Sequence, residues 1–296
     1  MKTGGTITTR LQGGLGNQLF QYAVGRAISI RFGRELLLDA RLIQREAPAR
    51  HYDLGVFKIR EQHVAGLPCW CVRWLCSIRF GRLFKVLCPL AWNYRLLQDR
   101  ESGFDASVFE PHAGPLVLQG YWQSYKYFQE HRELLQREFE LKTEPDALNQ
   151  TMLNEIESGN SVAVHVRRGD YVSSALANSI HGTCGPEYYS TAAALLGRKV
   201  SEPRFYVFTD DPAWARQNLA LPGPMRFVDH NLGKRDCEDL RLMSRCKHFI
   251  IANSSFSWWG AWLAQNRGKV VMAPARWFVQ DHYPPEDRIP ADWIRL

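Results

Sequence analysis

The chain has 296 residues, of which 45% are hydrophobic and 23% are charged, and its formal net charge at pH 7 is +7. These proportions are ordinary for a soluble globular protein and exclude a disordered or fibrous chain. The modest positive charge suits an anionic small molecule or an anionic membrane surface, whereas the lack of a basic run or a recognised motif argues against a nucleic-acid partner.

At this length two domains are expected, because a domain commonly holds roughly 100 to 200 residues. The first residues have neither the apolar core nor the cleavage site of a signal peptide, and no run of about 18 or more apolar residues follows. The sequence therefore predicts a cytoplasmic protein. Its seven cysteines are expected to be reduced there, and their spacing does not suggest a metal site.

The chain begins with a pattern that is typical of a parallel α/β sheet. A short β-rich run at residues 6–11 leads through a glycine-rich turn into a helix predicted over 19–32, which carries apolar residues on one face. The apolar run at 34–40 reads as the next buried strand. This β-α-β order predicts an α/β first domain.

The segment at residues 69–92 differs from its surroundings because it holds four basic residues, no acid and many large apolar residues. On a helix, Arg79, Arg82 and Lys85 would share one side, which would suit peripheral contact with anionic lipid on the inner face of the cytoplasmic membrane. The alternative is a helical pair that packs into the core and turns its basic side to solvent. Both interpretations fit the residues.

The domain boundary is predicted near residue 150. A strand expected at 116–122 precedes a helix expected over 127–139 that ends near Lys142, and the following residues resemble a linker or a helix entry. The predicted domains are therefore residues 1–150, an α/β domain, and residues 151–296, a doubly wound α/β domain.

The second half alternates strands and helices with short connections, which is typical of a parallel, doubly wound sheet. The predicted strands are 161–166, 204–209, 225–228, 248–252 and 270–273, and the predicted helices are 186–196, 212–218, 237–245 and 257–265.

The strand at 161–166 runs directly into two arginines, Arg167 and Arg168. Ligands of open parallel sheets bind beyond the carboxyl ends of the strands, so fixed positive charge there favours a phosphate or diphosphate site. Arginine suits a diphosphate because its planar fork donates two parallel hydrogen bonds and stays charged. The alternative is structural, with both arginines in salt bridges to Asp170 or Asp211.

Residues 253–257, NSSFS, follow a predicted strand and begin a tryptophan-rich helix. Serines at such a position can cap the free N–H groups of the helix, and the same N–H groups can bind an anion. Pure capping remains the alternative, above all for Ser257. The residues expected to contact such an anionic ligand are Asn253, Ser254, Ser255 and Phe256.

Two further turns are weaker signals. Residues 13–16, GGLG, match neither GxGxxG nor a Walker motif, so they serve either as a tight turn or as a helix start that faces a ligand. Asp210 and Asp211 precede Pro212, which indicates a helix entry. Asp211 would either accept hydrogen bonds from the base or ribose of a nucleotide ligand or cap the helix, and the residues do not decide between the two.

These motifs together closely resemble those of the α-1,2-fucosyltransferases of glycosyltransferase family 11. The resemblance rests on GGLGNQLFQYAVGRAIS, LQGYWQSYKYF, HVRRGDY, FTDDP and NSSFSWWGAWLA in this order, and it covers most of the chain except roughly residues 60–110. It implies a two-domain α/β fold of the GT-B type, in which residues 1–150 bind the acceptor, residues 151–296 bind the GDP-sugar, and the cleft lies between the domains. It also implies inverting transfer of L-fucose from GDP-β-L-fucose to the 2-hydroxyl of a terminal β-galactoside.

The resemblance further implies roles for individual residues. Arg167 and Arg168 would hold the β-phosphate and stabilise the departing GDP, and the turn with Gly14, Asn17 and Gln18 would approach the reacting carbon. The acceptor would be a surface glycan such as an O-antigen or capsule, assembled on a lipid carrier. No cofactor and no metal are expected, since arginines and helix N-termini can neutralise a diphosphate.

The sequence does not fix the identity of the general base. Asp170 and His165 are the best candidates by position, although an aspartate beside two arginines suits positioning better than proton removal. Catalysis without a base is the alternative. A transferase of another GDP-sugar or linkage would share the phosphate site, and a glycan-binding module without activity would instead rely on the aromatic residues.

Overall fold

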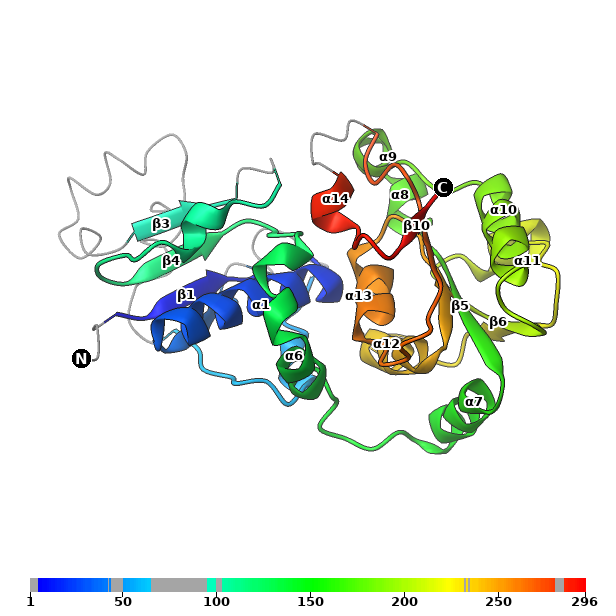
Figure 1. Cartoon of the computed structure of the whole chain (residues 1–296), viewed down its shortest axis with the longest axis horizontal. Helices are drawn as coiled ribbons and strands as arrows, with labels where there is room; N and C mark the ends of the chain where they lie inside the picture. Colours follow the sequence, from blue (N-terminus) through cyan, green and yellow to red (C-terminus); the bar gives the residue numbers. More distant parts are fainter. Residues whose placement is uncertain are drawn as a thin grey trace. The chain divides into compact units, whose positions relative to one another are not determined.

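The chain forms two units, Met1–Glu140 and Leu141–Leu296, each built on a parallel β-sheet. The computed structural model describes residues 5–41, 43, 50–64, 95–99, 103–231, 233, 235–279 and 285–296, without the side chains of Asp170 and Pro285 (Figure 1). The basic apolar segment at 69–92 lies outside the described residues.

The first unit contains a four-stranded sheet in the order β2-β1-β4-β3, in which every neighbouring pair is parallel. Its strands are β1 (Ile7–Arg10), β2 (Leu36–Asp39), β3 (Arg95–Gln98) and β4 (Leu116–Gln119). Helix α1 (Leu15–Phe32) connects β1 to β2 and ends at Gly33, whose φ of 61° lies in the left-handed region that favours glycine. The predicted β-α-β start is confirmed, and the helix begins four residues before its predicted start at 19.

The segment before the unit boundary differs from its prediction. In place of one helix over 127–139, two 3-10 turns, Tyr125–Tyr127 and Gln129–His131, precede helix α6 (Arg132–Glu138). Tertiary packing explains the difference, because the Phe128 ring is buried 5.8 Å from the ring of Phe20. The backbone at Phe128, with φ −140° and ψ 7°, therefore interrupts the helix. Further 3-10 turns are Leu54–Val56 and Ala106–Phe109.

The second unit contains a six-stranded parallel sheet in the order β10-β9-β8-β5-β6-β7. The strands are β5 (Asn160–Val166), β6 (Pro203–Thr209), β7 (Met225–Val228), β8 (His248–Ile250), β9 (Val271–Ala273) and β10 (Ile294–Arg295). From β5 the chain first moves outward through β6 and β7, and then returns to the other side of β5 with β8. The point between β5 and β8 is therefore a topological switch point, where sheets of this kind bind ligands.

Helices cover both faces of this sheet (Figure 1). Its helices are α7 (Ala147–Ser158), α8 (Gly169–Ser173), α9 (Ala175–His181), α10 (Pro186–Gly197), α11 (Pro212–Asn218), α12 (Asp236–Arg245), α13 (Ser255–Leu263) and α14 (Pro285–Arg288). Figure 1 shows α10 and α11 on one face, with α12 and α13 on the other. The alternate residues Val162, Val164 and Val166 of β5 join the core that also contains Tyr189 and Leu196 of α10.

Helix α7 belongs to the second unit, so residue 150 lies within a helix and the unit boundary falls at Glu140/Leu141. Asp146 starts this helix by accepting a hydrogen bond from the backbone N of Asn149 at 2.9 Å. α7 then packs against β5 and α12. None of the helices in the described part of the chain combines the length and the apolar character needed to cross a membrane.

Candidate active site

Two sequence motifs meet at the switch point of the larger sheet. Arg167 and Arg168 follow β5 directly, and residues 253–255 follow β8, the strand paired with β5. Because the carboxyl ends of parallel strands lie at the same edge of a sheet, both motifs occupy that edge. The strands β5 and β8 thus position an arginine pair next to the start of helix α13.

Asp210 fixes the arginine turn. Its Oδ1 accepts a hydrogen bond from the backbone N of Arg168 at 2.8 Å, and its Oδ2 lies 3.0 Å from Nη1 of Arg167. A Cβ on Gly169 would come within 2.7 Å of the same carboxylate, so glycine allows the close approach. The sequence motifs alone do not place Asp210 in the site. In the structure β5 pairs with β6 up to Val166 and Thr209, so the residues that follow them, Arg167 and Asp210, lie side by side.

Arg168 is held from two directions. Its Nε lies 3.4 Å from Oδ2 of Asp211, and its Cζ lies 4.0 Å from the centre of the Trp214 ring. The side chain is 18% exposed. Among the described residues, none accepts a hydrogen bond from its two terminal nitrogens. The structural alternative for the arginines therefore applies in part: both form ion pairs, while the terminal nitrogens of Arg168 have no acceptor in the described structure.

Asp211 caps helix α11. Its Oδ1 accepts a hydrogen bond from the backbone N of Trp214 at 3.1 Å, while its Oδ2 faces Arg168. The capping alternative is thus observed, and both carboxylate oxygens are engaged within the protein. A direct contact between Asp211 and the donor remains a prediction.

The start of helix α13 carries no side-chain cap within the described structure, although Ser254 occupies the N-cap position. The hydroxyl of Ser257 donates instead to the backbone oxygens of Ser254, at 3.2 Å, and Ala252, at 3.4 Å. Pure capping by Ser257 is therefore not what the structure shows. Uncapped N–H groups together with the positive end of the helix dipole favour a bound anion at this point.

Asn253 is buried, with 3% of its surface exposed, and its amide connects neighbouring loops. Its Nδ2 donates to the backbone oxygens of His181, at 2.8 Å, and Trp277, at 3.2 Å. Its Oδ1 lies 3.8 Å from the sulfur of Cys184. This amide holds the edge of the sheet together, and contact of Asn253, Ser254, Ser255 or Phe256 with the donor stays a prediction.

His165 is a weak base in this structure. It is the penultimate residue of β5, and its ring centre is 5.6 Å from that of Phe256. Burial, and secondarily the charge of Arg167, lower its pKa to about 3. The imidazole is therefore neutral at physiological pH and has little affinity for the proton of a sugar hydroxyl. The other candidate base, Asp170, lies in α8, and its side chain is outside the described structure.

In the first unit, Gln18 is fully buried and its amide is used within the fold. Its Nε2 donates to the backbone oxygen of His51 at 2.7 Å and approaches Oδ2 of Asp53 at 3.2 Å. Its Oε1 accepts from the backbone N of Asp53 at 2.9 Å. Gln18 therefore ties the loop at residues 51–53 to the start of α1.

The neighbouring residues of this turn are partly exposed. Gly14 occupies the N-cap position of α1, and Oδ1 of Asn17 accepts a hydrogen bond from Nε2 of Gln123 at 2.8 Å. Gly13 has a φ of 76°, which favours glycine at the turn. The role of Gly14, Asn17 and Gln18 near a reacting carbon remains a prediction.

No group of three or more histidine, cysteine, aspartate or glutamate side chains that could hold a metal is found among the described residues. A metal-independent reaction stays a prediction.

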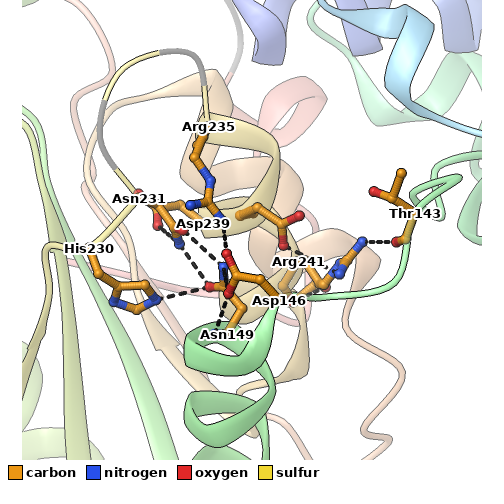
Figure 2. A network of polar contacts seen from close by, with 10 residues as sticks. Thr143, Asp146, Asn149, His230, Asn231, Arg235, Asp239 and Arg241 are labelled. Carbon is orange, nitrogen blue, oxygen red and sulfur yellow. Dashed lines mark hydrogen bonds and ion pairs between the residues drawn. The ribbon is translucent and has the colours of Figure 1, made fainter.

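A buried polar network joins α7 to α12 (Figure 2). Nδ2 of Asn149 donates to Oδ1 of Asn231 at 3.0 Å, and Nδ2 of Asn231 donates to Oδ1 of Asp239 at 2.9 Å. Arg235 forms an ion pair with Asp146 at the start of α7. Burial, aided by the nearby acids of α12, raises the pKa of Asp239 to about 7.

Asp239→Asn should remove a pH-dependent loss of stability. Because the folded-state pKa is about 7 and the ordinary pKa of an aspartate is 3.8, the stabilising contribution of Asp239 is fully present below about pH 4 and is lost as the pH rises to 7. The amide keeps an acceptor for Asn231 and does not ionise. The free energy of unfolding of the variant minus that of wild type should be on the order of 2 kcal/mol larger at pH 8 than at pH 4.5. Urea unfolding of both proteins at both pH values measures this difference. If variant and wild type differed by the same free energy at pH 8 and at pH 4.5, the raised pKa of Asp239 would be contradicted.

The comparisons with known proteins agree on the family. The model of Glycosyl transferase family 11 matches residues 92–296. The α-1,2-colitosyltransferase of Escherichia coli is 32% identical over 295 residues, and the match covers 98% of each chain. Human galactoside α-(1,2)-fucosyltransferase 1 is 28% identical over 275 residues, which cover 88% of this chain and 66% of the human one.

The solved structure of an Arabidopsis thaliana FUT1 mutant in complex with GDP matches with a TM-score of 0.54 at 11% identity, over 94% of this chain and 72% of that one. This likeness and the parallel sheets of both units confirm the predicted α/β fold of the GT-B type. The family match over more than half of the chain, with the near full-length relative, shows that the protein is a glycosyltransferase belonging to family 11.

Proposed function

We propose that this protein is an inverting α-1,2-fucosyltransferase that moves L-fucose from GDP-β-L-fucose to the 2-hydroxyl of a terminal β-galactoside. One observation carries the proposal. Arg168 follows β5 and the uncapped start of α13 follows β8, so the two lie on either side of the switch point. A diphosphate needs charge and N–H donors of this kind.

The chemistry needs little more than stabilisation of the leaving group. The acceptor oxygen forms a bond to C1 of fucose while the bond from C1 to the β-phosphate oxygen breaks, and GDP leaves with the electron pair. Arg168 and the N–H groups of α13 would stabilise the negative charge that develops on the phosphate. The acceptor proton would pass to water or to a phosphate oxygen, since His165 is a weak base.

The choice of fucose draws on the human relative named as an α-(1,2)-fucosyltransferase, and on the sequence resemblance. The second candidate is transfer of colitose from GDP-colitose, which the 32% identical relative named α-1,2-colitosyltransferase favours. Both candidates share the linkage position and the GDP site. We further propose a surface glycan on a lipid carrier as the acceptor and a cytoplasmic location, with peripheral membrane contact through residues 69–92.

A donor-by-acceptor panel tests the proposal. GDP-L-fucose, GDP-colitose and GDP-mannose are each mixed with a terminal β-galactoside or its 2-deoxy analogue, with and without EDTA, and GDP release is measured. We expect release with GDP-L-fucose and the galactoside, none with the 2-deoxy analogue, no effect of EDTA, and an α-1,2 linkage by NMR. Release only with GDP-colitose would select the second candidate, and no release with any donor would point to a glycan-binding module. Loss of activity in EDTA that magnesium or manganese restores would contradict a metal-free site.

A further inference from the structure

The side chain of Trp214 forms a platform beneath Arg168. Trp214 lies in the first turn of α11, is partly buried and packs against the core of the second unit. At 4.0 Å from the ring centre, Cζ of Arg168 is in direct stacking contact with the indole. Indole is the most effective aromatic partner for a cation. One face of the guanidinium is thereby occupied by a ring that is itself held by the core.

Asp211 completes this holder by linking the two side chains. One carboxylate oxygen accepts from the backbone N of Trp214 at 3.1 Å, and the other lies 3.4 Å from Nε of Arg168. The same residue thus fixes the start of the helix that carries the indole and the inner edge of the guanidinium. The guanidinium of Arg168 is thus contacted at Nε and on one face. Its two terminal nitrogens, at the outer edge, have no acceptor in the described structure.

We propose that Trp214 and Asp211 are positioning residues that hold the Arg168 guanidinium in place, so that its two terminal nitrogens meet the diphosphate of the donor. The inference rests on the proposed function and deepens it. A free arginine side chain would have to lose rotamer freedom at the moment of binding, whereas a held one is already oriented. Preorganised donors of this kind act on the transition state and raise kcat more than they lower KM.

The same helix offers a matched control. Arg216 of α11 stacks on Phe227 with its Cζ 4.1 Å from the ring centre, and its Nη2 lies 2.6 Å from Oδ2 of Asp229. This second trio repeats the chemistry of the first, an arginine with one aromatic and one aspartate. No motif of the family resemblance includes it, so Phe227→Leu removes an equivalent contact away from the arginine turn.

The test compares three substitutions by steady-state kinetics with the donor established by the panel. Trp214→Leu should lower kcat about tenfold with KM for the donor changed less than about threefold, and Trp214→Phe should recover most of the loss. Asp211→Asn keeps a capping oxygen for α11 and removes the charge beside Nε, and should lower kcat by about three- to tenfold. Phe227→Leu should leave kcat within about twofold of wild type.

A double-mutant cycle separates positioning from general destabilisation. In the Arg168→Ala background, Trp214→Leu should cause no further loss of kcat, because the group that it positions is gone. Additive losses, or an unchanged kcat for both Trp214→Leu and Asp211→Asn, would overturn the inference. If Arg168→Ala lowers kcat while these two variants do not, the inference alone fails. If the wild-type protein releases no GDP, or Arg168→Ala has no effect, the proposed function fails and the inference with it.

Discussion

Arg168→Ala is expected to lower kcat by about 10²- to 10³-fold, the usual cost of removing one donor that stabilises developing negative charge. The reason lies in its place after β5, beside the start of α13, where its terminal nitrogens have no acceptor among the described residues. GDP release at saturating donor and acceptor measures the effect. Calorimetric titration with GDP should show weaker binding by the same variant.

Two companion variants sharpen this prediction. Arg168→Lys keeps the charge and loses the planar fork, so it should recover only part of the activity. Arg216→Ala removes an arginine with an equivalent aromatic and aspartate environment, and should leave kcat within about twofold of wild type. Nearly normal kinetics of Arg168→Ala, with the circular dichroism spectrum of wild type, would remove Arg168 from the mechanism.

The elements of the second unit were largely predictable because local and tertiary preferences agree there. Helix α11 and strand β7 begin and end at the predicted residues 212–218 and 225–228. An Asp-Pro pair sets the start of α11, and β7, MRFV, is a short run that is apolar except for Arg226. The predicted strand at 248–252 ends earlier, at Ile250, because the backbone N of Ser254 already turns back to Ala252.

Helices α8 and α9 could not be anticipated in the same way. Their apolar residues Val172, Leu176 and Ile180 recur at a spacing of four, yet all three are exposed in the structure. The stripe is short and spans two helices of five and seven residues that are separated at Ser174, so periodicity did not mark either helix.

The candidate site could be located from the sequence, but its internal contacts could not. Strand ends place Arg168 and Ser254 at one edge of the sheet, because that rule depends only on parallel strands. The contacts of Asp210 and Trp214 depend on the register of β5 against β6 and on the direction of α11, which no local pattern encodes. The same holds for the pKa of His165, since burial is a property of the folded chain.

Glu138→Ala is expected to cause the largest loss of stability, about 3–5 kcal/mol, as is typical when one partner of a buried ion pair is removed. Glu138 closes α6, and its Oε1 lies 2.9 Å from Nε of Arg26 in α1, with both side chains 9% exposed. Its Oε2 also accepts from the hydroxyl of Tyr22 at 2.7 Å. Without the carboxylate, the Arg26 charge would be left buried without its partner from α6. The free energy of unfolding in urea, measured on the full chain, gives the loss.

A surface pair in the same unit provides the control. Lys58 and Glu140 lie 2.9 Å apart with both side chains 53% exposed, so Glu140→Ala should cost less than about 1 kcal/mol. Replacing both buried partners, as Arg26→Met with Glu138→Leu, should recover most of the stability lost in Glu138→Ala, because no charge is then left buried. If Glu138→Ala lowered the stability no more than Glu140→Ala does, the Arg26–Glu138 pair would contribute only as much as an exposed pair. The buried contact between α1 and α6 would then not be what stabilises the packing of these helices.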